Sequence, residues 1–299
     1  MTTSMRGKVV LVTGAARGVG AEMSRRLATR GATMSLVGME PERLRALAAE
    51  LGDRHIWFEC DVTDQRALDA AVSGTVAALG AIDIVVANAG IASHGTVSVA
   101  DVEALARVIN VNLIGVLRTA HATLPHVVAS KGYMLLIASV AAFTAMPGLS
   151  AYAASQAGVE QLANMLRLEL QSSGVDVGCA YMSWVDTDMV RDVRRDIVTF
   201  DDVLKRLPGP LGKITSLSEC AELLVGAVES RADTVFVPGS VKGASVLRML
   251  LASRLVRRLT RASIAEQLKH SEEQVRQLGR SFGEHSVGMG ESSGGNRER

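Results

Sequence analysis

Short apolar runs alternate with longer amphipathic stretches along most of this chain, and this alternation restricts the possible folds more than any other feature. Apolar runs with the length of buried strands lie at residues 8–13, 32–37, 55–60, 82–88, 133–139, 175–182 and 234–238. Stretches with helical patterns separate them, at residues 19–30, 41–51, 64–79, 102–130, 151–172 and 218–230. Such alternation produces right-handed crossovers and a parallel sheet with helices on both faces. We therefore predict a single doubly wound α/β domain of the Rossmann type, with a parallel sheet of about seven strands.

The first predicted strand runs into a glycine-rich turn with the sequence TGAARGVG, at residues 13–20. Gly14 permits a tight turn, Gly18 lets a pyrophosphate approach the backbone, and Gly20 lets the next helix pack on the strand. The helix N-terminus adds free N–H groups and the positive end of its dipole. Such a turn can merely join a strand to a helix. Its place after the first strand of an alternating series favours a nucleotide site.

A second chemical pattern follows the fifth predicted strand. Ser139 ends that strand, and Tyr152 lies thirteen positions later, at the start of the next predicted helix. A strand end and the following helix can present a hydroxyl and a phenol to one cleft. Position 156 lies one helical turn beyond Tyr152 on the same face, where a cation would stabilise a phenolate. This chain has Gln156 there. The alternative is a core tyrosine and a strand-end serine without a catalytic role.

The bulk properties exclude several other classes of protein. A formal net charge of +1 gives no global electrostatic reason to bind nucleic acid. Cys60, Cys179 and Cys220 are odd in number and widely spaced, which favours reduced thiols in the core. The histidines show no metal-ligand spacing, so no metal site is predicted. No apolar run approaches about 18 residues, and the first residues do not resemble a signal peptide, so we expect a cytoplasmic protein.

Several motifs, taken in order, resemble those of the short-chain dehydrogenase/reductase family. The turn at residues 13–20 resembles the TGxxxGxG motif of that family, and ANAG at residues 87–90 is similar to its NNAG motif. The resemblance covers about residues 7–239 and implies a nicotinamide cofactor that exchanges a hydride with a carbonyl or alcohol carbon. The cofactor-binding positions that it implies are Gly14, Arg17, Gly18, Val19, Gly20, Asp61, Val62, Asn88, Ala89, Gly90, Tyr152, Gln156 and Thr187.

The resemblance also implies individual roles. Tyr152 would exchange a proton with the substrate as general acid or base, and Ser139 would hydrogen-bond the substrate oxygen. Asn112 would hold a water on the proton path. Asp61 would contact the adenine, and Thr187 would contact the carboxamide of the nicotinamide.

Two positions depart from the family pattern. Gln156 stands in place of the lysine of the YxxxK motif, which binds the nicotinamide ribose and lowers the pKa of the tyrosine. Glutamine can still hydrogen-bond ribose hydroxyls, but it carries no charge, and each lost pKa unit represents about 1.4 kcal/mol between protonation states. Met182 and Ser183 replace the usual Pro-Gly beside the nicotinamide. We expect cofactor binding to be better preserved than proton transfer.

The end of the second predicted strand bears on the choice of cofactor. Relatives that prefer NAD usually have an acidic residue there, whereas this chain has Gly38 and Met39. Arg17 could meet the 2′-phosphate of NADP, and Glu40 could instead bind the ribose hydroxyls of NAD. We expect NADP to be preferred over NAD.

Residues 185–216 separate the sixth strand from the next helix. The resemblance implies that this segment closes over the substrate as a helical lid. Its apolar residues fit a pocket wall and ordinary helix packing equally well. His94, after the fourth strand, is either at the mouth of the cleft or a plain loop histidine.

The chain continues beyond the predicted sheet with a basic segment. Residues 242–261 contain six basic and no acidic residues, together with many large apolar ones. Such a helix can lie on an anionic membrane surface, or it can pack on the domain or on a partner subunit. Residues 264–279 predict a second, more polar helix. We therefore expect a dinucleotide-binding catalytic domain at 1–239, a basic amphipathic helical extension at 240–284 and a disordered tail at 285–299.

Two functions follow from these expectations. The first is an NAD(P)-dependent oxidoreductase for an apolar, lipid-like alcohol or ketone. The second is a cofactor-binding pseudoenzyme that senses or scaffolds, because the active-site lysine is replaced by Gln156. The resemblance implies a homodimer or homotetramer formed through the helices at 102–130 and 151–172.

Overall fold

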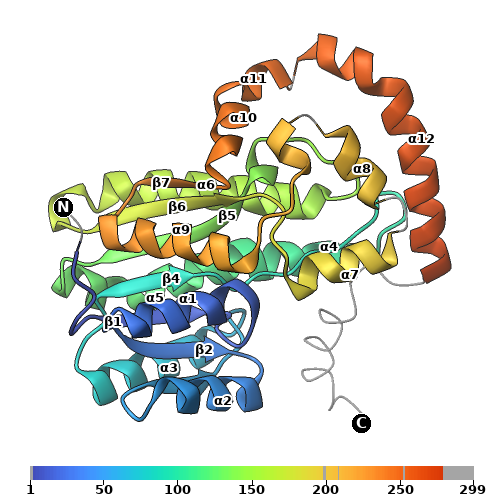
Figure 1. Ribbon diagram of the computed structural model, residues 1–299. Helices are drawn as coiled ribbons and strands as arrows, with labels where there is room; N and C mark the ends of the chain where they lie inside the picture. Colours follow the sequence, from blue (N-terminus) through green and yellow to red (C-terminus); the bar gives the residue numbers. More distant parts are fainter. Residues whose placement is uncertain (1–2, 198–199, 208, 252, 279–299) are drawn as a thin grey trace.

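In the described part of the chain, seven parallel strands form one sheet, and helices cover both of its faces (Figure 1). The computed structural model describes residues 3–197, 200–207, 209–251 and 253–278. The strands are β1 (Val9–Thr13), β2 (Thr33–Gly38), β3 (Ile56–Glu59), β4 (Ile84–Ala87), β5 (Tyr133–Ser139), β6 (Asp176–Met182) and β7 (Thr234–Val237). Their order in the sheet is β3-β2-β1-β4-β5-β6-β7. The predicted doubly wound α/β fold is confirmed. Each predicted apolar run coincides with one of these strands to within two residues at either end, and β2 extends one residue beyond its run, to Gly38.

Successive side chains of each strand enter opposite helical layers, as the alternation of a pleated sheet requires. Val10 and Val12 of β1 belong to the buried cluster on one face, and Leu11 belongs to the cluster on the other. The first layer consists of α1 (Gly18–Thr29), α2 (Pro41–Leu51) and α9 (Leu217–Ser230), and the second of α3 (Gln65–Leu79), α5 (Gly115–Ala129) and α6 (Ser150–Glu169). Because both faces are covered, the strands are continuous apolar runs, and all seven residues of β5 are buried.

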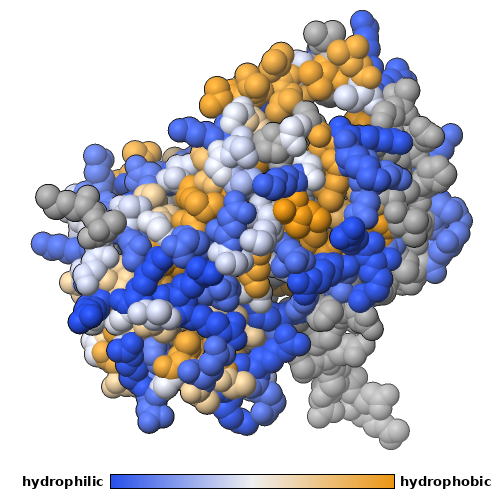
Figure 2. All heavy atoms as spheres, in the orientation of Figure 1, coloured by the Kyte–Doolittle hydropathy of each residue, from blue (hydrophilic) through white to orange (hydrophobic). Residues whose placement is uncertain are grey.

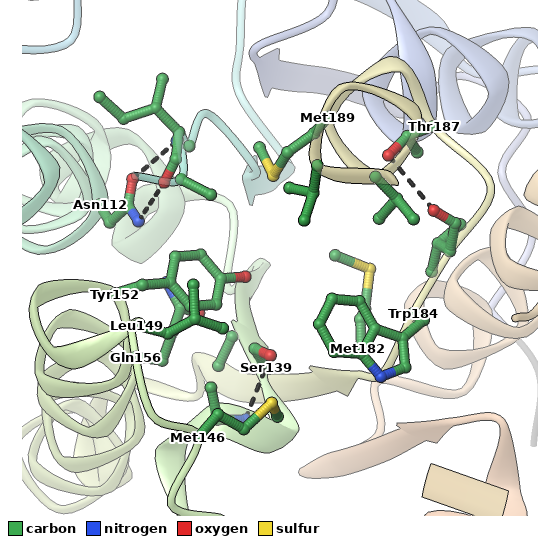
Figure 3. A pocket seen from close by; sticks show the side chains of 18 of the residues that line it. Asn112, Ser139, Met146, Leu149, Tyr152, Gln156, Met182, Trp184, Thr187 and Met189 are labelled. Atoms are coloured by element: carbon green, nitrogen blue, oxygen red, sulfur yellow. Dashed lines mark hydrogen bonds between the residues drawn. The ribbon is translucent and has the colours of Figure 1, made fainter. Parts of the chain in front are cut away.

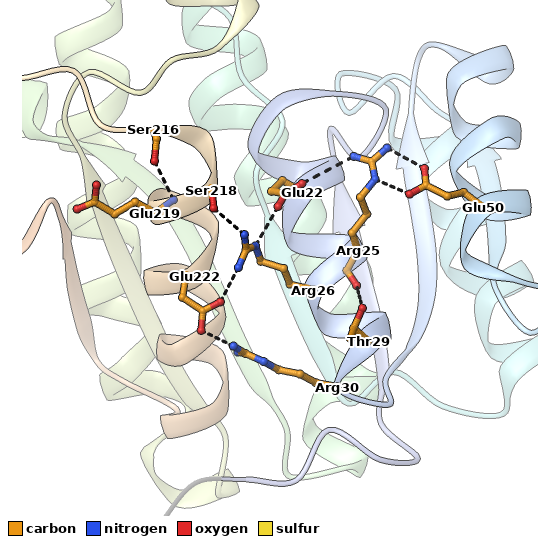
Figure 4. Close-up of polar contacts among 10 residues, drawn as sticks. All are labelled: Glu22, Arg25, Arg26, Thr29, Arg30, Glu50, Ser216, Ser218, Glu219 and Glu222. Carbon is orange, nitrogen blue, oxygen red and sulfur yellow. Dashed lines mark hydrogen bonds and ion pairs between the residues drawn. The ribbon is translucent and has the colours of Figure 1, made fainter.

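Ion pairs connect the helices of the first layer on their solvent side (Figure 4). Arg25 of α1 lies 2.8 Å from Glu50 of α2, and Arg26 lies 2.7 Å from Glu222 of α9. Arg30 also pairs with Glu222. Each exposed pair contributes only about 0–1 kcal/mol, so the buried apolar contacts hold the layer together and the ion pairs add to them.

The helix predicted at 102–130 is interrupted. It forms α4 (Val102–Ile109), a π-helical segment (Asn110–Ile114) and α5. Segments of this kind occur frequently at functional sites because they redirect a side chain within an otherwise regular helix. Here Asn112 lies within the π-helical segment and is only 2% exposed.

The extension differs in shape from the prediction. Residues 242–261 do not form one helix: α10 (Lys242–Val246) and α11 (Arg248–Leu251) are short, and α12 (Arg254–Leu278) runs on through both predicted helices. Figure 1 shows α12 arching from α11 down the side of the molecule, past α8 (Phe200–Arg206) toward α7 (Asp188–Asp196). The predicted tail at 285–299 lies outside the described residues. Among the described helices, none is both long and apolar enough to cross a membrane.

Candidate active site

A cavity of about 900 Å³ lies at the carboxyl ends of the central strands. Its walls include residues that follow β1, β2, β4, β5 and β6. The strand order changes direction between β1 and β4, and ligands of doubly wound folds bind at such a switch point. The predicted site residues that line the cavity are Gly14, Arg17, Gly18, Val19, Asp61, Val62, Asn88, Ala89, Gly90, Asn112, Ser139, Tyr152, Gln156 and Thr187.

The glycine-rich turn forms a cradle, and the space around each of its three glycines differs. Gly14 has a φ of +64°, and a Cβ there would lie 2.8 Å from the Cα of Ala89. Gly20 does not line the cavity; a Cβ on it would lie 2.3 Å from the carbonyl oxygen of Gly14. Beside Gly18, by contrast, the nearest atom to a built Cβ is Cγ2 of Thr187 at 3.7 Å. Gly14 therefore lets the turn approach the residues after β4, and Gly20 lets α1 approach the turn, while Gly18 leaves open space at the N-terminus of α1. This arrangement fits a pyrophosphate.

Asn88 holds this cradle against β4. Its Nδ2 donates hydrogen bonds to the carbonyl oxygens of Thr13 at 3.0 Å and Gly14 at 3.2 Å. The Oγ1 of Thr13 in turn accepts from the backbone N–H groups of Asn88 and Ala89. The side chain of Asn88 is thus occupied with the backbone of the turn, which makes it a positioning residue.

At the other end of the cradle, Arg17 and Glu40 face each other, with Arg17 Nε 3.1 Å from Glu40 Oε2. The two side chains had been predicted as alternative partners of the adenosine ribose, and both line the cavity. Asp61, which also lines it, accepts a hydrogen bond from the backbone N–H of Thr63 at 2.8 Å. A ribose or a 2′-phosphate in this region would meet a cation and a carboxylate together.

Ser139 and Tyr152 bring their hydroxyl groups to one space, as Figure 3 shows. Ser139 is held at the end of β5, where its Oγ accepts a hydrogen bond from the backbone N–H of Ala141 at 3.2 Å. Burial raises the pKa of Tyr152 above its usual value near 10, and a hydrogen bond with Ser139 opposes only part of that rise. No charged side chain contributes to this shift within the described chain. At neutral pH the phenol is therefore protonated.

Gln156 lies beneath Tyr152 in the wall of the cavity and is 5% exposed. Its Nε2 lies 3.5 Å from Oγ of Ser155, which is fully buried. Ser155 Oγ donates to the backbone carbonyl of Tyr152 at 2.7 Å and lies 3.4 Å from Nδ2 of Asn112. Ser155 thus joins the three predicted residues. A lone serine inside a helical pattern gave no indication of this role.

Two hydrogen bonds join the side chain of Asn112 to the loop after β4. Its Oδ1 accepts from the backbone N–H of Ile91 and its Nδ2 donates to the carbonyl of Ile91, both at 2.9 Å. These bonds hold the loop that borders the cofactor cradle, so Asn112 positions part of the site. Its predicted contact with a water stays a prediction.

The residues after β6 form the side of the cavity opposite Tyr152 (Figure 3). Thr187 immediately precedes α7, and its Oγ1 donates to the carbonyl of Val185 at 3.3 Å instead of capping the helix. Buried Oγ of Ser183 and Nε1 of Trp184 have no hydrogen-bond partner among the described residues. Both residues line the cavity. Sequence analysis noted Ser183 only as a departure from the family pattern and did not single out Trp184, so neither was identified as a possible donor to a ligand.

Apolar side chains enclose the half of the cavity beyond Tyr152. Figure 3 shows Met146, Leu149, Met182, Trp184 and Met189 around this space. The C-terminal helix closes the remaining side with Val256, Thr260, Ile264 and Leu268 of α12, together with Leu251 of α11. Four of these positions are spaced by four residues, so they share one helical face. The extension therefore forms a wall of the cavity.

The far end of α12 is attached to the loop after β4. Glu272 Oε1 accepts hydrogen bonds from Thr96 Oγ1 at 2.6 Å and from Ser98 Oγ at 3.2 Å. Val275 is 4% exposed and lies against Gly95, where a built Cβ would be 3.4 Å from it. These contacts place α12 across the opening of the cavity.

His94 belongs to the same loop and lines the cavity. Its Nε2 lies 3.9 Å from Oδ2 of Asp196 at the end of α7, and both side chains are buried. His94 is therefore part of the wall and lies between the loop after β4 and α7.

Comparisons with known proteins agree with this geometry. Residues 8–198 match the sequence model of the family described as short chain dehydrogenase. The chain is 32% identical over 223 residues to (+)-borneol dehydrogenase 1 of Salvia officinalis, covering 73% of this chain and 85% of the relative. It is 33% identical over 212 residues to a 3-alpha-(or 20-beta)-hydroxysteroid dehydrogenase of Mycobacterium bovis, covering 71% and 81%. It is 29% identical over 242 residues to 2-(R)-hydroxypropyl-CoM dehydrogenase of Xanthobacter autotrophicus, covering 78% and 95%.

The match spans both the glycine cradle and the pair formed by Ser139 and Tyr152. Fold, cavity and relatives therefore agree on an oxidoreductase of a type that uses NAD or NADP. The chain belongs to the short-chain dehydrogenase family.

Proposed function

We propose that this chain is an NAD(P)-dependent oxidoreductase that transfers a hydride between nicotinamide and the carbinol or carbonyl carbon of an apolar, lipid-like substrate. The observation that carries the proposal is one cavity with two different halves. A glycine cradle borders one half, apolar side chains enclose the other, and the hydroxyls of Ser139 and Tyr152 lie between them. The named alcohols of the relatives, a borneol and a hydroxysteroid, support an apolar substrate.

The roles of the residues follow from their positions. The bound nicotinamide would donate or accept the hydride. Ser139 hydrogen-bonds the substrate oxygen and stabilises the negative charge that develops on it during reduction. Tyr152 gives its hydroxyl proton to that oxygen, so a ketone becomes an alcohol. Because the pKa of Tyr152 is raised, the phenol holds its proton at neutral pH and is rarely the phenolate that alcohol oxidation needs.

NADP is the proposed cofactor. Arg17 lies at the edge of the cradle where the 2′-phosphate would be, and Met39 rather than an acidic residue follows β2. Glu40 opposes this preference, because its carboxylate would repel a phosphate. The balance of the two side chains sets the preference.

The test is turnover of a panel of apolar ketones and alcohols with NADPH and NADH, followed by absorbance of the reduced nicotinamide. We expect reduction of at least one apolar ketone, faster with NADPH. Tyr152→Phe should lower the rate about 10²- to 10⁴-fold while cofactor binding persists. A Tyr152→Phe variant as active as the wild type would overturn the assigned role of Tyr152.

The second candidate is a cofactor-binding pseudoenzyme with a sensing or scaffolding role. Its support is the neutral side chain of Gln156 where a cation would make Tyr152 acidic. Cofactor binding without turnover of any member of the panel would favour this candidate over the oxidoreductase.

We also propose that the chain is a cytoplasmic homodimer or homotetramer. The three cysteines are buried and unpaired, which suits a reducing compartment. The helices α5 and α6 expose Leu117, Met165 and Leu168, the last with 67% of its surface. Light scattering should give the mass of a dimer or tetramer for the wild type and a smaller mass for Leu168→Glu. A monomeric wild type would refute the assembly.

A further inference from the structure

An exposed apolar surface lies at the start of the extension. Four large apolar residues here expose more than half of their surfaces: Val246 at the end of α10 (74%), Leu247 between the helices (52%), and Met249 (82%) and Leu250 (56%) of α11. We call these residues the apolar crest. Other exposed apolar residues, such as Val97 and Leu223, lie on separate elements. Figure 2 shows the crest as a band of hydrophobic residues along the top of the molecule, where Figure 1 places α10, α11 and the beginning of α12. A contiguous patch of this kind marks an interaction surface.

Basic residues precede, interrupt and follow the crest in the sequence. Lys242, Arg248, Arg254, Arg258 and Arg261 are exposed, and no acidic residue occurs between residues 242 and 261. Arg248 pairs with Glu160 of α6 at 2.8 Å. For Lys242, Arg254 and Arg258, no carboxylate partner is found in the part of the chain that the structure describes. The rim of the crest therefore carries a positive charge that calls for an anionic partner.

The crest and the cavity lie on opposite sides of one segment. Leu251, which follows the crest, lines the cavity, and so do Val256 and Thr260 of α12. For residues 242–261 the sequence left two alternatives open, contact with an anionic membrane and packing on the domain or on a partner subunit. In the structure, different residues of the segment would serve the two roles. The inner face of α12 packs over the cavity, while the crest lies on the outer surface.

We propose that the apolar crest and its basic rim dock on an anionic lipid bilayer. The four apolar side chains enter the boundary between headgroups and acyl chains, and the rim arginines and lysine meet the lipid phosphates. A single short apolar anchor binds membranes only weakly, and the addition of basic side chains makes the attachment effective. The combination of large exposed apolar groups with basic neighbours fits a bilayer better than a second copy of this chain, because two basic rims would repel each other.

The test is co-sedimentation of the full-length protein with vesicles of phosphatidylcholine alone or mixed with phosphatidylserine. We expect binding to the mixed vesicles, weaker binding to phosphatidylcholine, and loss of binding as salt concentration rises. Met249→Glu combined with Leu250→Glu should lower the partition coefficient at least about tenfold. Arg254→Gln combined with Arg258→Gln should lower it for the mixed vesicles by about tenfold or more.

The matched control is Val102→Glu, because Val102 is 68% exposed and starts α4 away from the crest. This variant should bind vesicles like the wild type, and circular dichroism should show all variants folded. Equal sedimentation of the wild type and the Met249→Glu, Leu250→Glu variant would overturn the proposal. A wild type that sediments with neither vesicle type would also overturn it. The same holds if the Met249→Glu, Leu250→Glu variant differs from the wild type only in its oligomeric mass in solution. These binding measurements need no turnover, so they stand apart from the test of the proposed oxidoreductase.

Discussion

Tyr152 is subject to two opposing influences, and their balance decides what chemistry the site can perform. Burial raises its pKa, and the hydrogen bond with Ser139 lowers it less than burial raises it. A raised pKa means that the phenol keeps its proton to a higher pH than a free tyrosine does. Alcohol oxidation needs the phenolate, so its rate should rise with pH up to that pKa. Ketone reduction needs the phenol and should be nearly independent of pH around neutrality.

Replacing Gln156 by lysine tests this balance. A cation one helical turn from Tyr152 stabilises the phenolate, so Gln156→Lys should lower the pKa of Tyr152 and raise the rate of alcohol oxidation at neutral pH about 10- to 100-fold. The rising limb of the pH–rate profile should move to lower pH. Gln156→Met is the control of similar length without charge. Equal profiles for the lysine and methionine variants would contradict the electrostatic explanation.

The ion pair between Arg17 and Glu40 provides a second prediction at the scale of residues. Glu40→Gln removes the carboxylate that would repel a 2′-phosphate, so the Kd for NADPH should fall about tenfold. Arg17→Gln should raise it by a similar factor and change the Kd for NADH little. Arg43→Gln is the control, because Arg43 contacts Glu40 at 3.4 Å but does not line the cavity. Binding can be followed by fluorescence of the reduced cofactor. Parallel changes for both cofactors would refute discrimination by this pair.

Among the elements, α12 limits the size of the substrate pocket, which its amino-acid composition alone does not indicate. Its apolar residues at positions 256, 264 and 268 face the cavity and limit the size of what can bind. Ile264→Trp should fill part of this space and lower kcat/KM for large apolar ketones about tenfold or more, with a smaller effect on small ones. Ala265→Trp is the control, because Ala265 is exposed on the same turn. If both variants affect large and small substrates alike, α12 does not shape the substrate pocket.

The ion pairs between α1, α2 and α9 give a prediction about stability and pH (Figure 4). Arg26 and Arg30 lower the pKa of Glu222 from its usual 4.5. The resulting stability is present above pH 4.5 and is lost as the pH falls through the lower folded-state value. Glu222 is about half exposed, so Glu222→Gln should reduce the free energy of unfolding by only about 1 kcal/mol at neutral pH and low salt. Urea unfolding should show this difference disappear in acid; a pH-independent difference would contradict the ion-pair origin.

An element could be predicted from the sequence where residues close together in the chain determine its structure, and not where distant contacts do. The strands were predictable because a doubly covered sheet requires continuous apolar runs, and the cradle because Gly14 and Gly20 are needed for close approach. The π-helical segment around Asn112 was not, since no residue type distinguishes its hydrogen-bond pattern from that of an α-helix. The path of α12 was not predictable either. Spacing by four residues defines a face of a helix, but not that this face meets the loop at Thr96.

At the scale of the whole molecule, the C-terminal extension closes the cavity that opens at the carboxyl ends of the strands. The sheet and its helices provide the cradle and position Ser139 and Tyr152. Residues of α11 and α12 line the apolar half of the cavity, whereas the apolar crest lies on α10, α11 and the residue between them. The cavity wall and the proposed membrane surface therefore belong to one continuous segment.

The cavity spans several elements of the sheet, so cofactor binding should stabilise the molecule as a whole. A ligand that binds only the folded state adds about 2.7 kcal/mol at a concentration one hundred times its Kd. For a chain of this size that corresponds to a rise in Tm of about 4 °C. NADPH should produce this rise, and NADH at the same concentration a smaller one. Since melting needs no turnover, the result holds for an enzyme and for a pseudoenzyme alike. Gly18→Glu places a carboxylate where the pyrophosphate would lie, so neither cofactor should raise its Tm. Because Gly18 has a φ of +54°, the Tm of the unliganded variant should itself lie below that of the wild type. An unchanged Tm of the wild type with both cofactors would refute the cofactor site itself.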